Sequence, residues 1–182
     1  NFSFEILVGN DCSSDETHNI ISKYSEQCSN IKYYRRTANL GANENFADLA
    51  RRAKGKFVAI CEGDDYWIDQ FKLQKQVDFL QSHPDFTICF HPVKIQYEKD
   101  SEIDEFFPDE RPKDLNLEGL LIRNFIQTNS VVYRWRYSDR NPFTLPAEIA
   151  PADWYIHILH AELGKIGYLE DVMSVYRKHN AG

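Results

Sequence analysis

Short apolar runs alternate with helix-like segments along the first half of this chain. The runs that predict strands are "FEILVGN" (4–10), "IKYYRR" (31–36) and "KFVAIC" (56–61). Each is followed by a segment with the periodicity of a helix, over 13–28, 43–54 and 69–83. Strands that alternate with helices favour right-handed βαβ crossovers and a mostly parallel sheet covered by helices. The sequence therefore predicts an α/β fold.

The second half of the chain has a different pattern. A strand over 86–97 is interrupted at Pro92, and the stretch 98–114 carries eight acidic residues, three basic residues and two prolines. Such a charged stretch is typical of a solvated loop. Further on, we expect a helix, a strand, a helix and one or two final strands, over 116–125, 130–135, 152–163 and 167–182.

Composition limits the class of protein. The 182 residues are 42% hydrophobic, enough for one domain (1–182) with a sizeable core. The net charge of -7 argues against binding of nucleic acid, which needs clustered Lys and Arg. No apolar run is long enough to span a bilayer, and no signal-peptide pattern is present. The four cysteines lack the spacing of a zinc site, which favours a reduced, cytoplasmic chain.

Acidic turns follow two of the predicted strands. "EGDD" (62–65) comes directly after the strand 56–61, and "NDCSSD" (10–15) follows the strand 4–10. Because ligands of open α/β sheets collect beyond the carboxyl ends of the strands, we expect both turns to face one crevice. Carboxylates packed this closely resist ionisation unless they share a positive partner. A divalent cation with phosphate oxygens would supply one, although acidic residues at strand ends also serve as turn formers and helix caps.

Two longer stretches are similar to a known family. "FEILVGNDCSSDET" (4–17) and the segment from "NLGANENFADLARRAKGKFVAICEGDDYWID" to "KLQKQVDFL" (39–80) resemble the nucleotide-sugar-dependent glycosyltransferases of family 2, of bacterial type, which have the GT-A fold. The resemblance implies a Rossmann-like sheet flanked by helices. It also implies a D-x-D type motif that holds ribose and a divalent cation, Mn²⁺ or Mg²⁺.

The resemblance assigns roles position by position. It implies nucleotide binding for four residues, Asn10, Asp11, Asn45 and Asp64, and metal binding for two, Asp65 and His179. Asn10 and Glu62 depart from the family pattern, in which Asp is common at both positions. These departures leave the class intact and leave the choice of nucleotide open.

Further residues are expected around the donor sugar and its phosphates. They are Glu62, Trp67, Thr128, Asn129, Ser130 and Arg177. Asp153 matches the family's catalytic carboxylate at a helix start. Each has a purely structural alternative: an edge turn for 128–130, a helix cap for Asp153 and an exposed basic tail for the C-terminal segment. We interpret His91 and His160 as structural, and His157 as able to reach an acceptor.

The implied activity is the inverting transfer of a sugar from a nucleoside-diphosphate sugar, a UDP or dTDP sugar, to a hydroxyl acceptor. The acceptor would be a carbohydrate or a lipid-linked sugar in the synthesis of a surface polysaccharide or glycoconjugate. We expect a cytoplasmic protein, with at most peripheral association with the inner face of the membrane. Two other hypotheses stay open: a non-catalytic nucleotide-sugar-binding domain, and a sugar nucleotidyltransferase, although the Gly-rich basic loop of the latter is not evident in the sequence.

The family's sheet begins with a strand and helix upstream of the strand that "FEILV" would form. That first strand lies between the counterparts of 4–9 and 56–61. Removing a central strand would leave two rows of backbone groups unpaired, at a cost beyond the ~5 to 15 kcal/mol by which domains are stable. We therefore expect that the 182 residues lack one βα unit of the complete fold, or that another segment fills its place. A gap of about 10 Å between the two flanking strands would support this expectation.

Overall fold

The computed structural model of the chain describes residues 2–98, 104–137, 143–146 and 151–179. The chain divides into two compact units. Unit 1 comprises Asn1–Lys56 and Arg136–Ala152, and unit 2 comprises Phe57–Trp135 and Asp153–Gly182. Within the described residues, none of the helices has the length and apolar character needed to cross a membrane.

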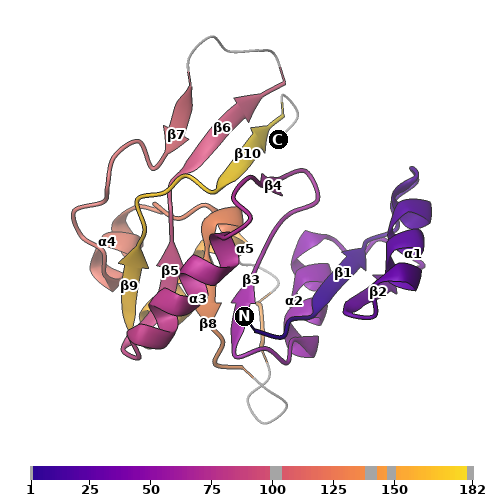
Figure 1. Ribbon diagram of the computed structural model, residues 1–182, viewed down its shortest axis with the longest axis horizontal. Coiled ribbons are helices and arrows are strands. Elements are labelled where there is room, and N and C mark those ends of the chain that lie inside the picture. Colours follow the sequence, from indigo (N-terminus) through magenta and orange to yellow (C-terminus); the bar gives the residue numbers. More distant parts are fainter. Residues whose placement is uncertain (1, 99–103, 138–142, 147–150, 180–182) are drawn as a thin grey trace. The chain divides into compact units, whose positions relative to one another are not determined.

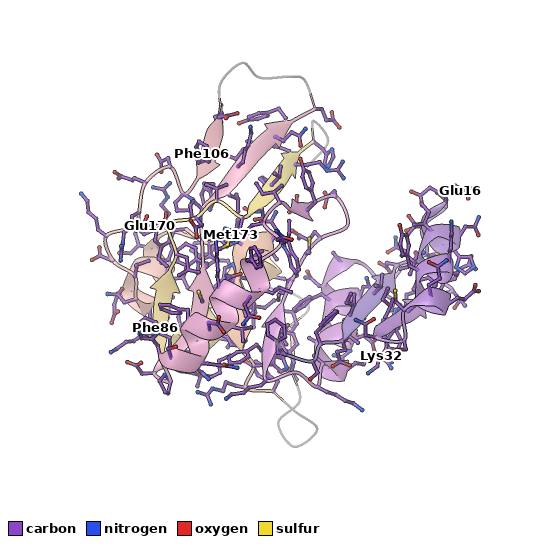
Figure 2. All side chains as sticks on the ribbon, in the orientation of Figure 1. Glu16, Lys32, Phe86, Phe106, Glu170 and Met173 are labelled. Atoms are coloured by element: carbon purple, nitrogen blue, oxygen red, sulfur yellow. The ribbon has the colours of Figure 1, made fainter. Side chains whose placement is uncertain are left out.

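Unit 1 is built as two βα repeats. Its elements are β1 (Ile6–Asn10), α1 (Thr17–Gln27), β2 (Ile31–Arg35) and α2 (Ala42–Arg52). The two strands run parallel, in a register that pairs Ile6 with Ile31 and Asn10 with Arg35. In Figure 1 they lie side by side, in indigo and purple. Figure 2 labels Lys32 on β2, whose Nζ lies 2.5 Å from the Glu5 carboxylate.

Two glycines shape the end of β1 and the start of α2. A Cβ atom on Gly9 would lie 2.6 Å from the side-chain oxygen of Asn45, so glycine leaves room for the side chains of α2 that pack on the strand. Gly41 precedes the first residue of α2 with a φ of 84°, in the region that side-chain-bearing residues rarely adopt. These positions fix α2 against the carboxyl end of β1.

Unit 2 contains two four-stranded sheets. The first has the order β3 (Phe57–Ala59), β8 (Val132–Arg134), β5 (Phe86–Phe90), β9 (Lys165–Tyr168). The second has the order β4 (Tyr66–Trp67), β10 (Ser174–Lys178), β6 (Val93–Tyr97), β7 (Glu105–Phe107). Figure 1 shows β6, β7 and β10 side by side, with pink strands from the middle of the chain next to a yellow one from its end.

Helices complete unit 2. They are α3 (Lys72–Ser82), α4 (Leu117–Ile122), the short 3₁₀ helix η1 (Thr128–Ser130) and α5 (Ala152–Ala161), which enters unit 2 at Asp153. Leu80 of α3 packs with Cys89 of β5 and Val132 of β8 in one buried cluster. Met173, labelled in Figure 2, is fully buried before β10, and its carbonyl accepts a hydrogen bond from the Ile68 amide at 2.9 Å. This contact fixes β10 beside the segment that follows β4.

The α/β class and the order of the main elements agree with the sequence prediction, but two details differ. Parallel pairing was expected to dominate, yet β8 runs antiparallel to both β3 and β5, and β4 runs antiparallel to β10. The stretch 98–114 was expected to be a loop throughout, yet Glu105–Phe107 forms β7, antiparallel to β6. The two Phe residues of β7 give the charged stretch enough apolar character to extend the sheet.

The predicted missing strand concerns both units. β1 pairs with β2 within unit 1, and β3 pairs with β8 within unit 2. Because β1 and β3 belong to different units, the expected gap between them stays a prediction. The single-domain boundary of 1–182 also stays a prediction.

Candidate active site

The acidic turn that follows β3 forms one end of the candidate site in unit 2. The Asp65 amide donates to the Glu62 carbonyl at 3.1 Å, which closes the turn. Asp65 is 8% exposed, and each of its carboxylate oxygens accepts one hydrogen bond from the protein. The Asn129 side-chain amide donates to Oδ2 at 2.8 Å, and the Arg177 backbone N–H donates to Oδ1 at 2.9 Å. Asp65 is therefore held in one orientation by two distant segments.

The electrostatics of this turn favour protonation of two of its carboxyl groups, those of Glu62 and Asp65. Desolvation, followed by repulsion from Asp65, Asp153 and Asp64, raises the pKa of Glu62 to about 7. Desolvation also raises the pKa of Asp65, although the hydrogen bonds from Arg177 and Asn129 oppose the rise. A cation would reverse both shifts, because it stabilises the ionised carboxylates.

Asp153 lies in the first turn of α5, as the sequence predicted. The hydroxyl of Thr128 donates to its Oδ2 at 3.2 Å. Thr128 is followed by Asn129, which donates to Asp65 Oδ2, so neighbouring residues of η1 join Asp153 and the acidic turn. This arrangement gives the site one carboxylate on a helix and three on the turn.

The C-terminal segment contributes Arg177 and His179. The Arg177 side chain donates through Nε to the carbonyl of Asp64. His179 Nε2 lies 3.4 Å from Asp64 Oδ2, and its Nδ1 lies 3.0 Å from Glu98 Oε1. The end of β10 and the residue that follows it thus reach the acidic turn.

The 3₁₀ helix η1 behind the turn contains Thr128, Asn129 and Ser130, all of which are buried. The Ser130 hydroxyl donates to the Gln127 carbonyl at 2.6 Å. The Asn129 carbonyl accepts a hydrogen bond from Trp67 Nε1 at 3.0 Å, which fixes the indole ring beside the turn. These contacts tie η1 to β4.

Sequence reasoning missed a buried lysine on the other side of Trp67. Lys72 Nζ lies 4.5 Å from the centre of the Trp67 ring and donates to Gln76 at 2.8 Å. Gln76 in turn donates to the backbone carbonyls of Cys89 and Ser130. Burial lowers the pKa of Lys72 to about 7. One signal was present in the sequence, because Lys72 and Gln76 share a helix face with Leu80 at intervals of four residues.

The histidines interpreted as structural, His91 and His160, have no exposed surface. His157, which was expected to reach an acceptor, is also fully buried, and its Nδ1 lies 2.6 Å from the hydroxyl of Tyr133. Burial lowers the pKa of His157 to about 4. The expected access to an acceptor is therefore wrong, because α5 turns this side chain into the core, one helical turn beyond Asp153.

Unit 1 carries three of the four residues predicted to bind the nucleotide, and the fourth, Asp64, lies in unit 2. Asp11 accepts hydrogen bonds from the backbone amides of Leu40 and Gly41, at 2.7 and 2.9 Å. Asn10 donates to the Tyr33 hydroxyl at 2.9 Å and accepts from the Ser13 amide. Asn45 donates to the Gly9 carbonyl at 3.2 Å. All three join the end of β1 to neighbouring segments of the same unit.

The residues of unit 2 can be tested for their fit to a divalent cation. Among the residues that the structure describes, no three His, Cys, Asp or Glu side chains are grouped closely enough to hold one unaided. Each oxygen of Asp65 accepts a single protein hydrogen bond, which leaves a lone pair free for a cation. Magnesium sites commonly use one or two carboxylates and complete their shell with substrate phosphates and water. The Asp65 carboxylate, completed by phosphate oxygens and water, fits such a shared site.

Comparison with known proteins decides the family. The family model described as "Glycosyl transferase family 2" matches residues 2–134. The chain belongs to glycosyl transferase family 2. An uncharacterised protein of Mycobacterium tuberculosis is 44% identical over 184 residues, which cover 100% of this chain and 52% of that protein. The chain therefore spans about half the length of this relative.

Two further comparisons involve TarS of Staphylococcus aureus. Poly(ribitol-phosphate) beta-N-acetylglucosaminyltransferase TarS is 25% identical over 183 residues, covering 98% of this chain and 31% of TarS. A crystal structure of S. aureus TarS in complex with UDP-GlcNAc superimposes with a TM-score of 0.71 at 22% identity, covering 96% of this chain and 50% of that one. This second likeness concerns the fold, which is of the GT-A glycosyltransferase type.

Proposed function

We propose that the protein transfers a sugar from a nucleoside-diphosphate sugar to a hydroxyl acceptor, with inversion at the anomeric carbon, in the synthesis of a cell-surface polysaccharide or glycoconjugate. The observation that supports the proposal is that Thr128 and Asn129, neighbours in η1, donate hydrogen bonds to Asp153 and Asp65 in a family 2 chain. UDP sugars are the first donors to test, since the TarS neighbour holds UDP-GlcNAc.

In this proposal, Asp153 is the general base. The acceptor hydroxyl is a poor nucleophile at neutral pH, and a carboxylate opposite the leaving group can accept its proton during attack. The hydrogen bond from Thr128 orients the Asp153 carboxylate for this role. One displacement by the hydroxyl inverts the anomeric carbon.

The diphosphate gains negative charge as it leaves the sugar. Asp65 and His179 would hold a divalent cation together with the diphosphate, and the cation would stabilise the negative charge that develops there. Asp64 and Arg177 lie beside that position, and Arg177 would contact a phosphate oxygen once the donor displaces its hydrogen bond to the Asp64 carbonyl. The residues of unit 1, Asn10, Asp11 and Asn45, would bind the nucleoside.

Asp153→Asn tests the proposed base. We expect transfer to fall by about 100- to 10,000-fold while donor affinity stays within about twofold, because a general base acts mainly in the transition state. Product formation with a panel of UDP, dTDP and GDP sugars and Mn²⁺ would be measured together with donor binding. Asp171→Asn is the control, because that exposed carboxylate pairs with Lys75 away from the turn. Near-normal turnover of Asp153→Asn would make Asp153 a helix cap and place the base elsewhere.

The same panel separates the two alternatives. A non-catalytic nucleotide-sugar-binding domain would bind a donor without hydrolysis or transfer, and a nucleotidyltransferase would release pyrophosphate from a nucleoside triphosphate and a sugar phosphate. The expected location, cytoplasmic and at most peripheral to a membrane, stays a prediction.

A further inference from the structure

The side chain of Asn129 makes several hydrogen bonds beside the candidate site. Its side chain has no exposed surface. One side-chain N–H donates to Asp65 Oδ2 at 2.8 Å, and the side-chain nitrogen also donates to the Val175 carbonyl at 2.9 Å. The Ser174 hydroxyl donates to its Oδ1 at 2.9 Å. Both N–H groups and the oxygen are therefore engaged within the protein.

These partners fix the orientation of the Asn129 amide. Its nitrogen faces two acceptors, a carboxylate and a carbonyl, and its oxygen faces a hydroxyl donor. Rotating the amide by 180° would place its oxygen against both acceptors and leave buried groups unsatisfied, at a cost of about 1 to 3 kcal/mol each. The Val175 carbonyl, which can only accept, therefore fixes the direction in which Asn129 donates, and the Ser174 hydroxyl supplies the hydrogen bond to its oxygen.

The geometry points to Asn129, held by the Val175 carbonyl and the Ser174 hydroxyl, as the positioning residue that aims the Asp65 carboxylate at the cation and donor diphosphate. This role differs from the direct contact with donor sugar or phosphate that the sequence predicted for Asn129, and it rests on the proposed function. Asn129 fixes one carboxylate oxygen from η1, and the Arg177 amide fixes the other from β10. Residues that orient a metal ligand in this way typically affect metal affinity or activity by about 10- to 100-fold.

The same residue couples two neighbours of the donor position. Its backbone carbonyl accepts the hydrogen bond from Trp67 Nε1, and its side chain joins Asp65 to the first two residues of β10. A substitution of Asn129 should therefore weaken metal affinity more than donor-sugar contacts. Substitution of a residue that contacted the sugar directly should weaken the donor-sugar contacts more.

The test measures Mn²⁺ affinity by electron paramagnetic resonance in the presence of saturating UDP. Asn129→Leu keeps the size of the side chain and removes its donors, and we expect Mn²⁺ affinity to fall by about 10- to 100-fold. Ser174→Ala removes only the hydrogen bond to the Asn129 side-chain oxygen, so we expect a smaller loss of Mn²⁺ affinity, of about two- to tenfold. Thr87→Val is the matched control, because it removes a buried hydroxyl that donates to the His160 carbonyl at 2.6 Å, apart from the turn.

The outcomes separate the inference from the proposed function. Weaker Mn²⁺ binding in Asn129→Leu and Ser174→Ala, but not in Thr87→Val at similar thermal stability, supports the positioning role. Wild-type Mn²⁺ affinity in a folded Asn129→Leu protein overturns it. If Asn129→Leu does not fold, Ser174→Ala decides in the same way. If the wild-type protein binds no Mn²⁺ with UDP, the metal assignment of the proposed function fails instead.

Discussion

Asp48 of unit 1 and the acidic turn of unit 2 are in opposite electrostatic states. In unit 1, Asp48 on α2 accepts hydrogen bonds from Arg52 and Arg36, and these hold its pKa at about 2. In unit 2, desolvation and repulsion within the turn raise the pKa of Glu62 to about 7 and that of Asp65 above its usual value. Asp48 is paired with two arginines of unit 1, whereas the carboxylates of the turn lie near Arg177 and His179, and in the proposed function a bound cation adds further positive charge.

This difference indicates where ligand binding should change the protein most. Paired carboxylates stabilise the fold that contains them, and crowded carboxylates reduce its stability until a cation arrives. Removing the paired carboxylate of Asp48 should therefore lower the free energy of unfolding, and removing a crowded carboxylate of the turn should raise it.

The larger effect is expected in unit 1. Asp48→Asn removes a carboxylate bonded to two arginines, and the depressed pKa corresponds to about 2 kcal/mol of stability at pH 7. Because the pKa is lowered on folding, this contribution is complete above the unfolded value of 3.8 and is lost as the pH falls through about 2. Urea unfolding of wild type and variant should therefore differ at pH 7 and converge in strong acid.

Glu44→Gln is the matched control on the same helix. Glu44 pairs with Arg51, and both side chains are exposed, so we expect a change of about 0.5 kcal/mol or less. Equal losses for the two substitutions would contradict the picture of Asp48 as the paired charge that stabilises unit 1.

A smaller effect of opposite sign is expected from Glu62→Gln in unit 2. The pKa of Glu62 is raised from 4.5 to about 7, so the folded state binds more protons than the unfolded state between these values, and stability falls as the pH rises through them. Removing the charge should stabilise the metal-free protein by about 1 kcal/mol at pH 8, after allowance for solvent screening of this exposed side chain. Thermal unfolding in EDTA at pH 5 and pH 8 measures it. A variant less stable than wild type at pH 8 would argue against crowding at the turn.

Local signals in the sequence were enough to predict much of this architecture. The alternation of apolar runs and helical periodicity located β1, β2 and β3 and the helices between them. The acidic turn after "KFVAIC" and Asp153 at the start of a helix were visible for the same reason, since each depends on a few adjacent residues. Family resemblance then supplied their roles.

The local sequence signals did not predict which strands and side chains pair across long distances in the chain. β8 enters the sheet between β3 and β5, partners that lie more than 40 residues away in the chain. The hydrogen bonds of Asn129 likewise join residues separated by 64, 46 and 45 positions. Nothing in "QTNSVVYR" distinguishes an amide that binds a sugar from one that holds a carboxylate. Only the folded structure assigns the partners of such a side chain.

The most direct test of the account is the affinity of the wild-type protein for UDP by calorimetry, with Mn²⁺ and with EDTA. If the turn around Asp65 awaits a cation and a diphosphate, affinity with Mn²⁺ should exceed that in EDTA by at least about tenfold. Asp65→Asn should remove this difference, and Asp78→Asn, a change on the exposed face of α3, should retain it. Equal affinity of the wild-type protein in Mn²⁺ and in EDTA would contradict the account.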